Sequence, residues 1–182
     1  ALRPHLIWGP GDPHILPRII KMAKEKKLVR VGDGKNLVDM TYIDNAAEAH
    51  LLAAEKLRNS QNLSGLKYFL SDDCPVNLWE WIDTFLKALD MPPVQKSISF
   101  NKAMLAGKIS EFICRILPLG EPRMTPFAAS NLAHPHYFNI SAAKKDLGYK
   151  PIISGGQAFK NTVEYFKKNR VSFFDIRKNK KR

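Results

Sequence analysis

Strand-like apolar runs alternate with helix-like segments along most of the 182 residues, and this alternation is the strongest constraint on the fold. Residues 2–8 predict a buried strand that ends in the breaker run Gly9-Pro10-Gly11-Asp12-Pro13. An amphipathic helix with lysines on its polar face is expected from Ile15 onward. Such alternation is typical of α/β proteins that contain a parallel sheet.

Periodicity, turn residues and helix caps predict the remaining elements. The expected N-caps are Asp44, Asn77, Ser141 and Ser154, and Gly148 is the expected stop of a short helix. On the helix after Asn77 we expect the stripe Leu78, Trp81, Phe85 and Leu89 to face the core. Strands are expected at 28–31, 38–43, 67–70 and 94–99, and helices at 44–57, 77–89, 101–116, 125–132, 141–147 and from 154 onward.

The first strand has no strand before it in the sequence with which it can pair. A strand of a parallel sheet needs neighbours to satisfy its backbone N–H and C=O groups. We therefore expect that strands which precede it in the fold are absent from this sequence.

The formal net charge of +12 is concentrated in two places. One cluster, residues 18–30, lies on the expected first helix, where a solvated face explains it. The other is the basic end of the chain, residues 170–182. Because no nucleic-acid-binding motif accompanies either cluster, we expect no nucleic-acid partner. The end also contains Phe173-Phe174, so contact with a membrane surface or a pathway partner remains open beside a simple solvated tail.

The motifs that commonly carry catalysis or metal binding are missing. The sequence has no Gly-x-Gly-x-x-Gly run, and none of its five tyrosines has a lysine four residues later. Cys74 and Cys114 have no metal or redox spacing, and His134 and His136 lack a nearby third ligand. We expect no catalytic residue and no metal site in this chain, and a cytoplasmic location.

Several motifs resemble those of extended short-chain dehydrogenases, in the correct order and spacing. They are Leu2-Arg3-Pro4-His5-Leu6-Ile7-Trp8-Gly9-Pro10-Gly11, Gly32-Asp33-Gly34 through Asp44-Asn45-Ala46-Ala47, Tyr68-Phe69-Leu70-Ser71-Asp72, and Asp146-Leu147-Gly148-Tyr149-Lys150-Pro151. The chain is most similar to the 3β-hydroxysteroid dehydrogenase branch, and within it to the bacterial 2-alkyl-3-oxoalkanoate reductases. The resemblance implies the C-terminal part of an extended Rossmann fold. Residues 1–168 would hold the last parallel strands and a small substrate-binding subdomain, and 169–182 a basic, flexible tail.

The resemblance also implies a nicotinamide cofactor, NAD or NADP. In this family the loop after the first strand contacts the nicotinamide end, largely through backbone groups, which assigns Pro4, His5 and Ile7 as cofactor contacts. The alternative is that these residues only connect the strand to the following loop and contact no ligand. The glycine-rich loop and the Tyr-x-x-x-Lys pair of the family would lie before residue 1, so we expect this chain alone to be inactive.

The substrate implied by the resemblance is apolar. Members that act on nucleotide sugars usually carry an arginine where this chain has Val38, because the guanidinium grips a diphosphate. A second expected arginine is missing from residues 131–136. The helix at 101–116 carries many large apolar side chains, which suit a fatty-chain or sterol substrate or simply dock on the rest of the fold. Expected pocket walls are Trp8, His14, Pro17, Met104 and Met124.

The sequence thus predicts part of an NAD(P)-dependent oxidoreductase that acts on a hydroxyl or ketone of a small apolar molecule. A non-catalytic substrate-binding or interaction module is the alternative. Whether the protein forms a homo-oligomer stays open.

Overall fold

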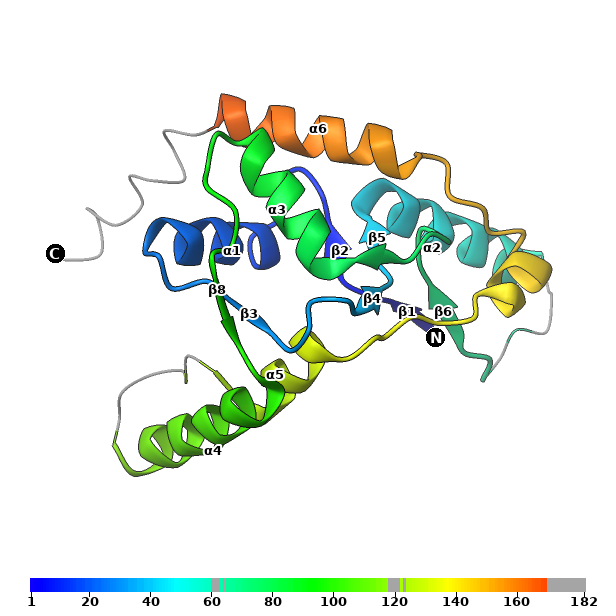
Figure 1. Ribbon diagram of the computed structural model, residues 1–182. Coiled ribbons are helices and arrows are strands. Elements are labelled where there is room, and N and C mark those ends of the chain that lie inside the picture. Colours follow the sequence, from blue (N-terminus) through cyan, green and yellow to red (C-terminus); the bar gives the residue numbers. More distant parts are fainter. Residues whose placement is uncertain (60–62, 64, 118–121, 123, 170–182) are drawn as a thin grey trace, which may run out of the picture. The chain divides into compact units, whose positions relative to one another are not determined.

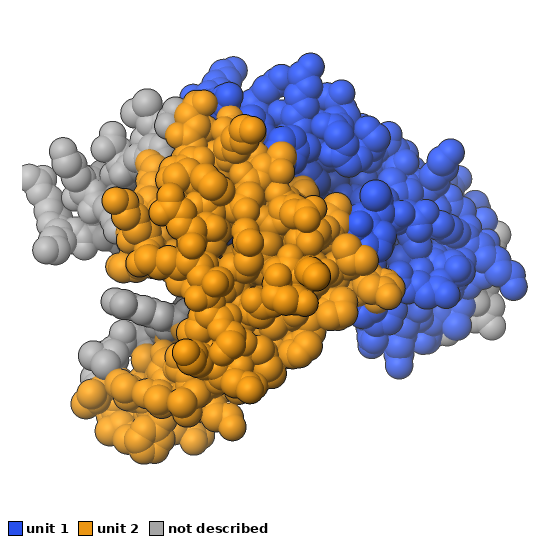
Figure 2. Space-filling model, in the orientation of Figure 1, with its two compact units in different colours: residues 1–20, 39–75, 138–182 blue, residues 21–38, 76–137 orange. Residues whose placement is uncertain are grey.

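A computed structural model describes residues 1–59, 63, 65–117, 122 and 124–169. The basic end from residue 170 onward lies outside the described residues, so the predicted tail remains a prediction. The chain divides into two compact units (Figure 2). Unit 1 comprises residues 1–20, 39–75 and 138–182, and unit 2 comprises residues 21–38 and 76–137.

Unit 1 contains two parallel strand pairs. β1 (Leu2–Pro4) pairs with β6 (Tyr68–Leu70), and β2 (Ile7–Trp8) pairs with β5 (Thr41–Tyr42). Four helical segments accompany these strands (Figure 1). They are α1 (Ile15–Lys24, which continues into unit 2), α2 (Ile43–Arg58), the π-helical turn η1 (Ala143–Leu147) and α6 (Gly155–Lys168).

One strand was expected at residues 2–8, but the structure has two, and the chain changes partner between them. His5 N–H still donates to Leu70 O, next to β6, whereas Leu6 O accepts from Thr41 N–H of β5. Leu6 makes this change at φ +44°, in the left-handed region that a bulky residue rarely adopts. The single-strand prediction is therefore wrong at this point, because long-range pairing with two different strands breaks the run.

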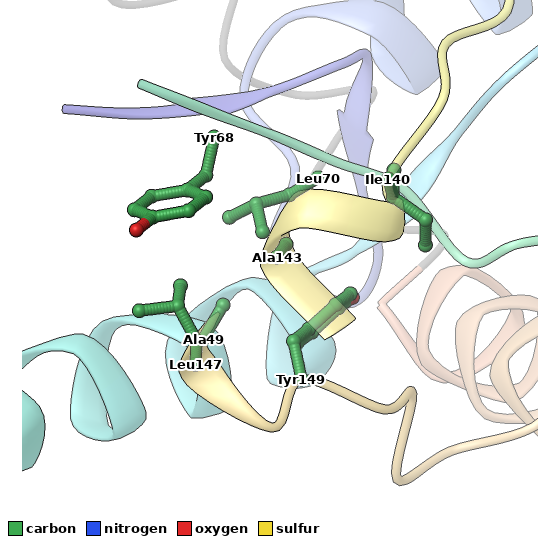
Figure 3. Packing of buried hydrophobic residues seen from close by; sticks show 7 residues of the cluster. All are labelled: Ala49, Tyr68, Leu70, Ile140, Ala143, Leu147 and Tyr149. Carbon is green, nitrogen blue, oxygen red and sulfur yellow. The ribbon is translucent and has the colours of Figure 1, made fainter. Parts of the chain in front are cut away.

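The core of unit 1 joins segments that are far apart in the sequence. Ala49 of α2 packs with Tyr68 and Leu70 of β6 and with side chains of the η1 region (Figure 3). Gly148 ends η1 at φ +71°, as its sequence position predicted. Tyr149 follows at once and its hydroxyl donates to Ser71 O, 3.1 Å away. The cluster members are Ala49, Tyr68, Leu70, Ile140, Ala143, Leu147 and Tyr149.

Unit 2 has one parallel and one antiparallel pair. β3 (Val29–Val31) runs parallel to β8 (Lys96–Ile98), and β4 (Leu37–Val38) runs antiparallel to β7 (Val76–Asn77). Arg30 of β3 forms an ion pair with Asp83 at 2.8 Å. The helices are α3 (Leu78–Ala88), α4 (Phe100–Ile116) and α5 (Pro126–Ala133).

Most predicted helices are confirmed, but two of the four predicted N-caps and part of one apolar stripe are wrong. Ser141 does not cap η1, whose N-cap position is Ala142 and has no side-chain hydrogen bond. Asn77 accepts from Trp79 N and Glu80 N, and Ser154 accepts from Gln157 N. Asp44, however, does not cap α2, which already begins at Ile43. On α3 the buried face contains Trp79, Ile82, Phe85, Leu86 and Leu89, so Leu78 and Trp81 were wrongly placed at its centre.

Within the described residues, no helix combines the length and the apolar character needed to cross a bilayer.

Candidate functional site

The carboxyl ends of the parallel strands in unit 1 are the natural place for a ligand, because open α/β sheets bind ligands beyond that edge. β1 and β6 end together, with Pro4 opposite Leu70 in the register. β2 and β5 also end together, with Trp8 opposite Tyr42. The segment from His5 to Pro17 leaves this edge and contains five of the predicted contact residues.

Thr41 connects the two strand pairs. Its buried Oγ1 accepts from His5 N–H at 3.2 Å and lies 2.8 Å from His5 O and 3.0 Å from Leu70 O. A hydroxyl has one proton, so it donates to one of these carbonyls at a time. Thr41 thereby fixes the main chain of His5, directly before Leu6, where the chain changes partner.

Asp72, just after β6, forms a second polar centre. Its carboxylate accepts from Tyr42 N at 2.9 Å and from Asn45 Nδ2 at 2.7 Å. Burial raises the pKa of the Asp72 carboxyl above its ordinary value, and these hydrogen bonds partly oppose the rise. Asp72 therefore links the segment after β6 to the junction of β5 and α2, through Tyr42 and Asn45.

Asn45 extends this centre to the loop before α6. Its Oδ1 accepts from Ile152 N and Ile153 N at 2.9 Å each, and its Nδ2 also donates to Ile153 O at 3.0 Å. With the bond to Asp72, the two donors and two acceptors of this buried amide are all used. Asn45 is thus a structural link between the strand ends and residues 152–153.

Asp12 caps α1 from within the loop that follows β2. Its carboxylate accepts from the backbone N–H groups of His14, Ile15 and Leu16 at 2.7, 3.1 and 2.8 Å. Exposed N–H groups at a helix start are what a phosphate ligand would use. At α1 they are taken by Asp12, so this helix start is a structural cap rather than a phosphate site.

Beside the predicted cofactor contacts lies a row of rings. The His5 imidazole meets Phe138 edge-on at 4.9 Å, Phe138 stacks on Phe69 at 4.4 Å, and the Arg3 guanidinium lies 5.8 Å from the Phe69 ring centre. Asp39 accepts from Phe138 N at 2.7 Å and holds that residue in place. This surface therefore offers the faces of aromatic rings. Ile7, two residues after His5, has an exposed side chain.

Ring faces suit the planar nicotinamide ring of a dinucleotide better than its anionic phosphates. The N–H and the C=O of His5 both have hydrogen-bond partners within the chain. A cofactor contact at His5 would therefore use its half-buried ring rather than its amide. Pro4 is half-buried and Ile7 exposed, and all three assignments remain predictions.

The five predicted pocket-wall residues are divided between the units. Trp8 is buried, with its ring 5.6 Å from that of Tyr42, so its indole belongs to the core of unit 1. His14 is exposed and Pro17 half-buried at the start of α1. Met104 of α4 and Met124, just before α5, are half-buried in unit 2. The three in unit 1 lie on one continuous segment, and the role of all five remains a prediction.

Val38, where related nucleotide-sugar enzymes carry arginine, is fully buried in β4 of unit 2. It pairs with Val76 and forms a further bridge to His136, whose N–H donates to Leu37 O. The His136 ring contacts Asn131 O at 2.9 Å, and the His134 ring contacts Ser130 O at 3.1 Å. Within the described part of the chain, no cluster of three or more His, Cys, Asp or Glu side chains is arranged to hold a metal ion.

Sequence reasoning missed the residues that organise this edge. Asp12 had a local signal, since an aspartate shortly before an apolar periodic segment is a favoured N-cap. Thr41, Asn45 and Asp72 had none, because their partners lie 27 to 108 residues away.

Residues 1–102 match the model of the 3-beta hydroxysteroid dehydrogenase/isomerase family. The chain belongs to this family. It is 45% identical over 155 residues to a 2-alkyl-3-oxoalkanoate reductase of Stenotrophomonas maltophilia, with 85% of this chain and 47% of that protein covered. It is 33% identical over 184 residues to a decarboxylating sterol-4-alpha-carboxylate 3-dehydrogenase of Mus musculus, with 99% and 49% covered. The chain thus spans about half the length of these curated relatives.

Solved structures confirm the predicted fold class. UDP-glucuronic acid 4-epimerase from Bacillus cereus, in complex with NAD, matches with a TM-score of 0.60 at 20% identity, over 92% of this chain and 44% of that chain. Epimerase Mth375 from Methanothermobacter thermautotrophicus matches with a TM-score of 0.62 at 15% identity, over 94% and 44%. These likenesses show that the chain has the α/β fold of the extended short-chain dehydrogenases.

Proposed function

We propose that the protein is an NAD(P)-dependent oxidoreductase that acts on a hydroxyl or ketone of an apolar substrate of the 2-alkyl-3-oxoalkanoate type. The observation that carries the proposal is the 45% identity to a 2-alkyl-3-oxoalkanoate reductase over 85% of this chain. In this proposal residues 1–182 supply part of the substrate-binding side and one edge of the cofactor site.

The chemistry of the strand edge supports this assignment. When bound, the nicotinamide cofactor supplies the hydride acceptor or donor. Residues of this chain would hold and orient the nicotinamide ring, since the rings of His5 and Phe138 offer a largely apolar surface beside the strand end. Pro4, His5 and Ile7 would contact the nicotinamide end. The proton transfer that accompanies hydride transfer would use groups outside this chain.

The substrate class is supported by a buried side chain. A diphosphate needs exposed cationic donors, and Val38 instead packs inside a strand pair where related enzymes carry the arginine. Residues 131–136 also contain no arginine. An apolar substrate needs no such group, because removing its surface from water drives binding.

A sterol or 3β-hydroxysteroid is the second candidate substrate. It is supported by the 33% identity to the mouse sterol-4-alpha-carboxylate 3-dehydrogenase over 99% of this chain. The higher identity to the bacterial reductase favours the alkyl-ketoacid. A non-catalytic module that keeps only the substrate side is the remaining alternative.

The test is a turnover assay on the longest protein that the gene encodes. NADH and NADPH oxidation would be followed with a long-chain 2-alkyl-3-oxoalkanoate, and NAD(P) reduction with a 3β-hydroxysteroid and with a UDP-sugar as control. We expect turnover of the ketoacid at a kcat/KM at least about tenfold above the steroid, a difference of about 1.4 kcal/mol in transition-state binding. Preference for the steroid would reverse the substrate assignment, and the absence of turnover with every compound would favour the non-catalytic module.

A further inference from the structure

Phe138 is held at the strand edge of unit 1 through both its main chain and its ring. Its backbone N–H donates to the carboxylate of Asp39 at 2.7 Å, and only 1% of Asp39 is exposed. A hydrogen bond to a charged acceptor is stronger than one between neutral groups. The Phe138 ring stacks on Phe69 of β6, with ring centres 4.4 Å apart and planes inclined by 10°. Phe138 therefore offers a fixed ring to its other neighbours.

His5 has a fixed main chain, but its ring needs a further constraint. The His5 N–H and C=O are bonded to Leu70 O and to the Thr41 hydroxyl. These bonds leave the side-chain torsions of His5 free, because rotation about them moves only the imidazole. The contacts around the half-buried ring must therefore select its rotamer.

The Phe138 ring makes one of these contacts. It meets the His5 imidazole at 4.9 Å between ring centres, with an angle of 65° between the planes. This edge-on arrangement is one of the two that aromatic pairs prefer. The contact joins a ring that is held on two sides to a ring whose main chain alone is held.

We propose that Phe138 is a positioning residue, which fixes the orientation of the His5 imidazole toward the nicotinamide ring and thereby sets the affinity for the cofactor. The inference rests on the proposed function, because it requires the cofactor contact at His5. It goes beyond that function because Phe138 acts through His5 and needs no contact of its own with the cofactor. A ring that is already oriented loses less conformational freedom when the cofactor binds.

The first test concerns the His5 rotamer alone and uses no cofactor. Scalar couplings that depend on χ1 of His5 are measured by NMR in the isotope-labelled 182-residue chain, in Phe138→Leu and in the control Phe159→Leu. Phe159 is a half-buried phenylalanine of α6 in the same unit. We expect the couplings of a single rotamer in the parent and in the control, and averaged couplings only in Phe138→Leu. The same couplings in all three proteins, or equal averaging in both variants, would overturn the inference.

The second test is a double-mutant cycle on the longest protein that the gene encodes. NADH and NADPH are titrated, and binding is followed by the fluorescence of the reduced nicotinamide. We expect Phe138→Leu to raise the Kd of the preferred cofactor about three- to tenfold, the range that the loss of one aromatic pair gives. In the His5→Ala background the same substitution should change the Kd less than about twofold, because no imidazole remains to be positioned. Phe138→Tyr keeps the ring and should restore most of the affinity.

The cycle separates failure of this inference from failure of the proposed function. If the parent binds the cofactor and Phe138→Leu raises the Kd equally with and without His5, Phe138 acts independently of His5. An unchanged Kd in Phe138→Leu would likewise overturn the inference, and in both cases the proposed function would stand. If the parent binds neither NADH nor NADPH, the proposed function fails and the inference fails with it.

Discussion

Removal of the Thr41 hydroxyl is the most direct test of how the strand edge is held together. Thr41→Val keeps the shape of the side chain and removes one hydrogen-bond donor and acceptor. His5 N–H retains its bond to Leu70 O, whereas His5 O loses the donor that lies 2.8 Å away. A fully buried carbonyl without a donor costs about 1–3 kcal/mol, and the bond to His5 O is partly buried. We therefore expect the free energy of unfolding to fall by about 1–2 kcal/mol.

The chain contains a matched control in the same unit. Thr162 of α6 is as fully buried as Thr41, and its hydroxyl donates to Ala158 O at 2.7 Å. That carbonyl belongs to the helix and keeps its main-chain donor after Thr162→Val. Because threonine and valine have similar helix propensities, we expect this variant to cost less than about 0.7 kcal/mol.

The free energies of unfolding of the parent chain and of the two variants would be obtained from urea denaturation followed by circular dichroism. The dependence of each free energy on urea concentration, its slope, would be compared among the three proteins. The reasoning requires Thr41→Val to lower the free energy at unchanged slope, and clearly more than Thr162→Val does. Equal effects of the two substitutions would show that the hydroxyl at the strand crossing adds nothing beyond ordinary burial, and would refute the role assigned to Thr41.

Three further predictions concern the caps, the helix packing and the buried carboxyl. Asp12→Ala should lower the free energy of unfolding by about 1–2 kcal/mol, because three N–H groups lose their acceptor. In the same urea assay, the control Asp44→Ala on α2 should lower it by less than about 0.5 kcal/mol. Gly107→Ala should lower the Tm, because the new Cβ would meet the α5 backbone at 2.8 Å. The control Gly156→Ala places its Cβ in open space and should leave the Tm unchanged. Equal Tm values for the two variants would contradict this prediction. Burial raises the folded-state pKa of Asp72 above its ordinary value of 3.8, so protonation favours the folded state. The free energy of unfolding of the parent chain, measured relative to Asp72→Asn, should therefore rise as the pH falls through the folded pKa and level off below 3.8; a flat or falling difference would count against it.

Helices were the most predictable part of this fold because their signals are local. The bounds of α4 and α5 follow from apolar periodicity, and Thr125 before Pro126 marks the α5 start, with its hydroxyl accepting from Ala128 N. The Gly148 stop is equally local. Each of these signals lies within a few residues of the feature that it predicts.

The strand edge was less predictable because distant partners decide it. Nothing in residues 2–8 marks Leu6 as the point where the chain leaves β6 for β5, since Thr41 and Leu70 determine it. The start of α2 was also misplaced, because the helix begins at Ile43 with no side-chain cap. Tyr42, just before it, is held by Asp72, a partner 30 residues away. In the candidate site, the sequence predicted the segment that leaves the strand edge. It did not predict the side chains that hold this edge in place.

The motifs that relate this chain to the dehydrogenases turn out to be the residues that hold its strand edge. Thr41 and Asn45 of one motif and Asp72 of another form the two polar centres, and Tyr149 of a third donates to Ser71 beside them. These polar centres position the main chain at the strand edge of this chain and do not depend on which molecule is bound. Resemblance in these motifs therefore carries information about the fold more than about the substrate. The substrate must be argued from positions outside these polar centres, of which Val38, buried where a cation would be needed, is the most informative.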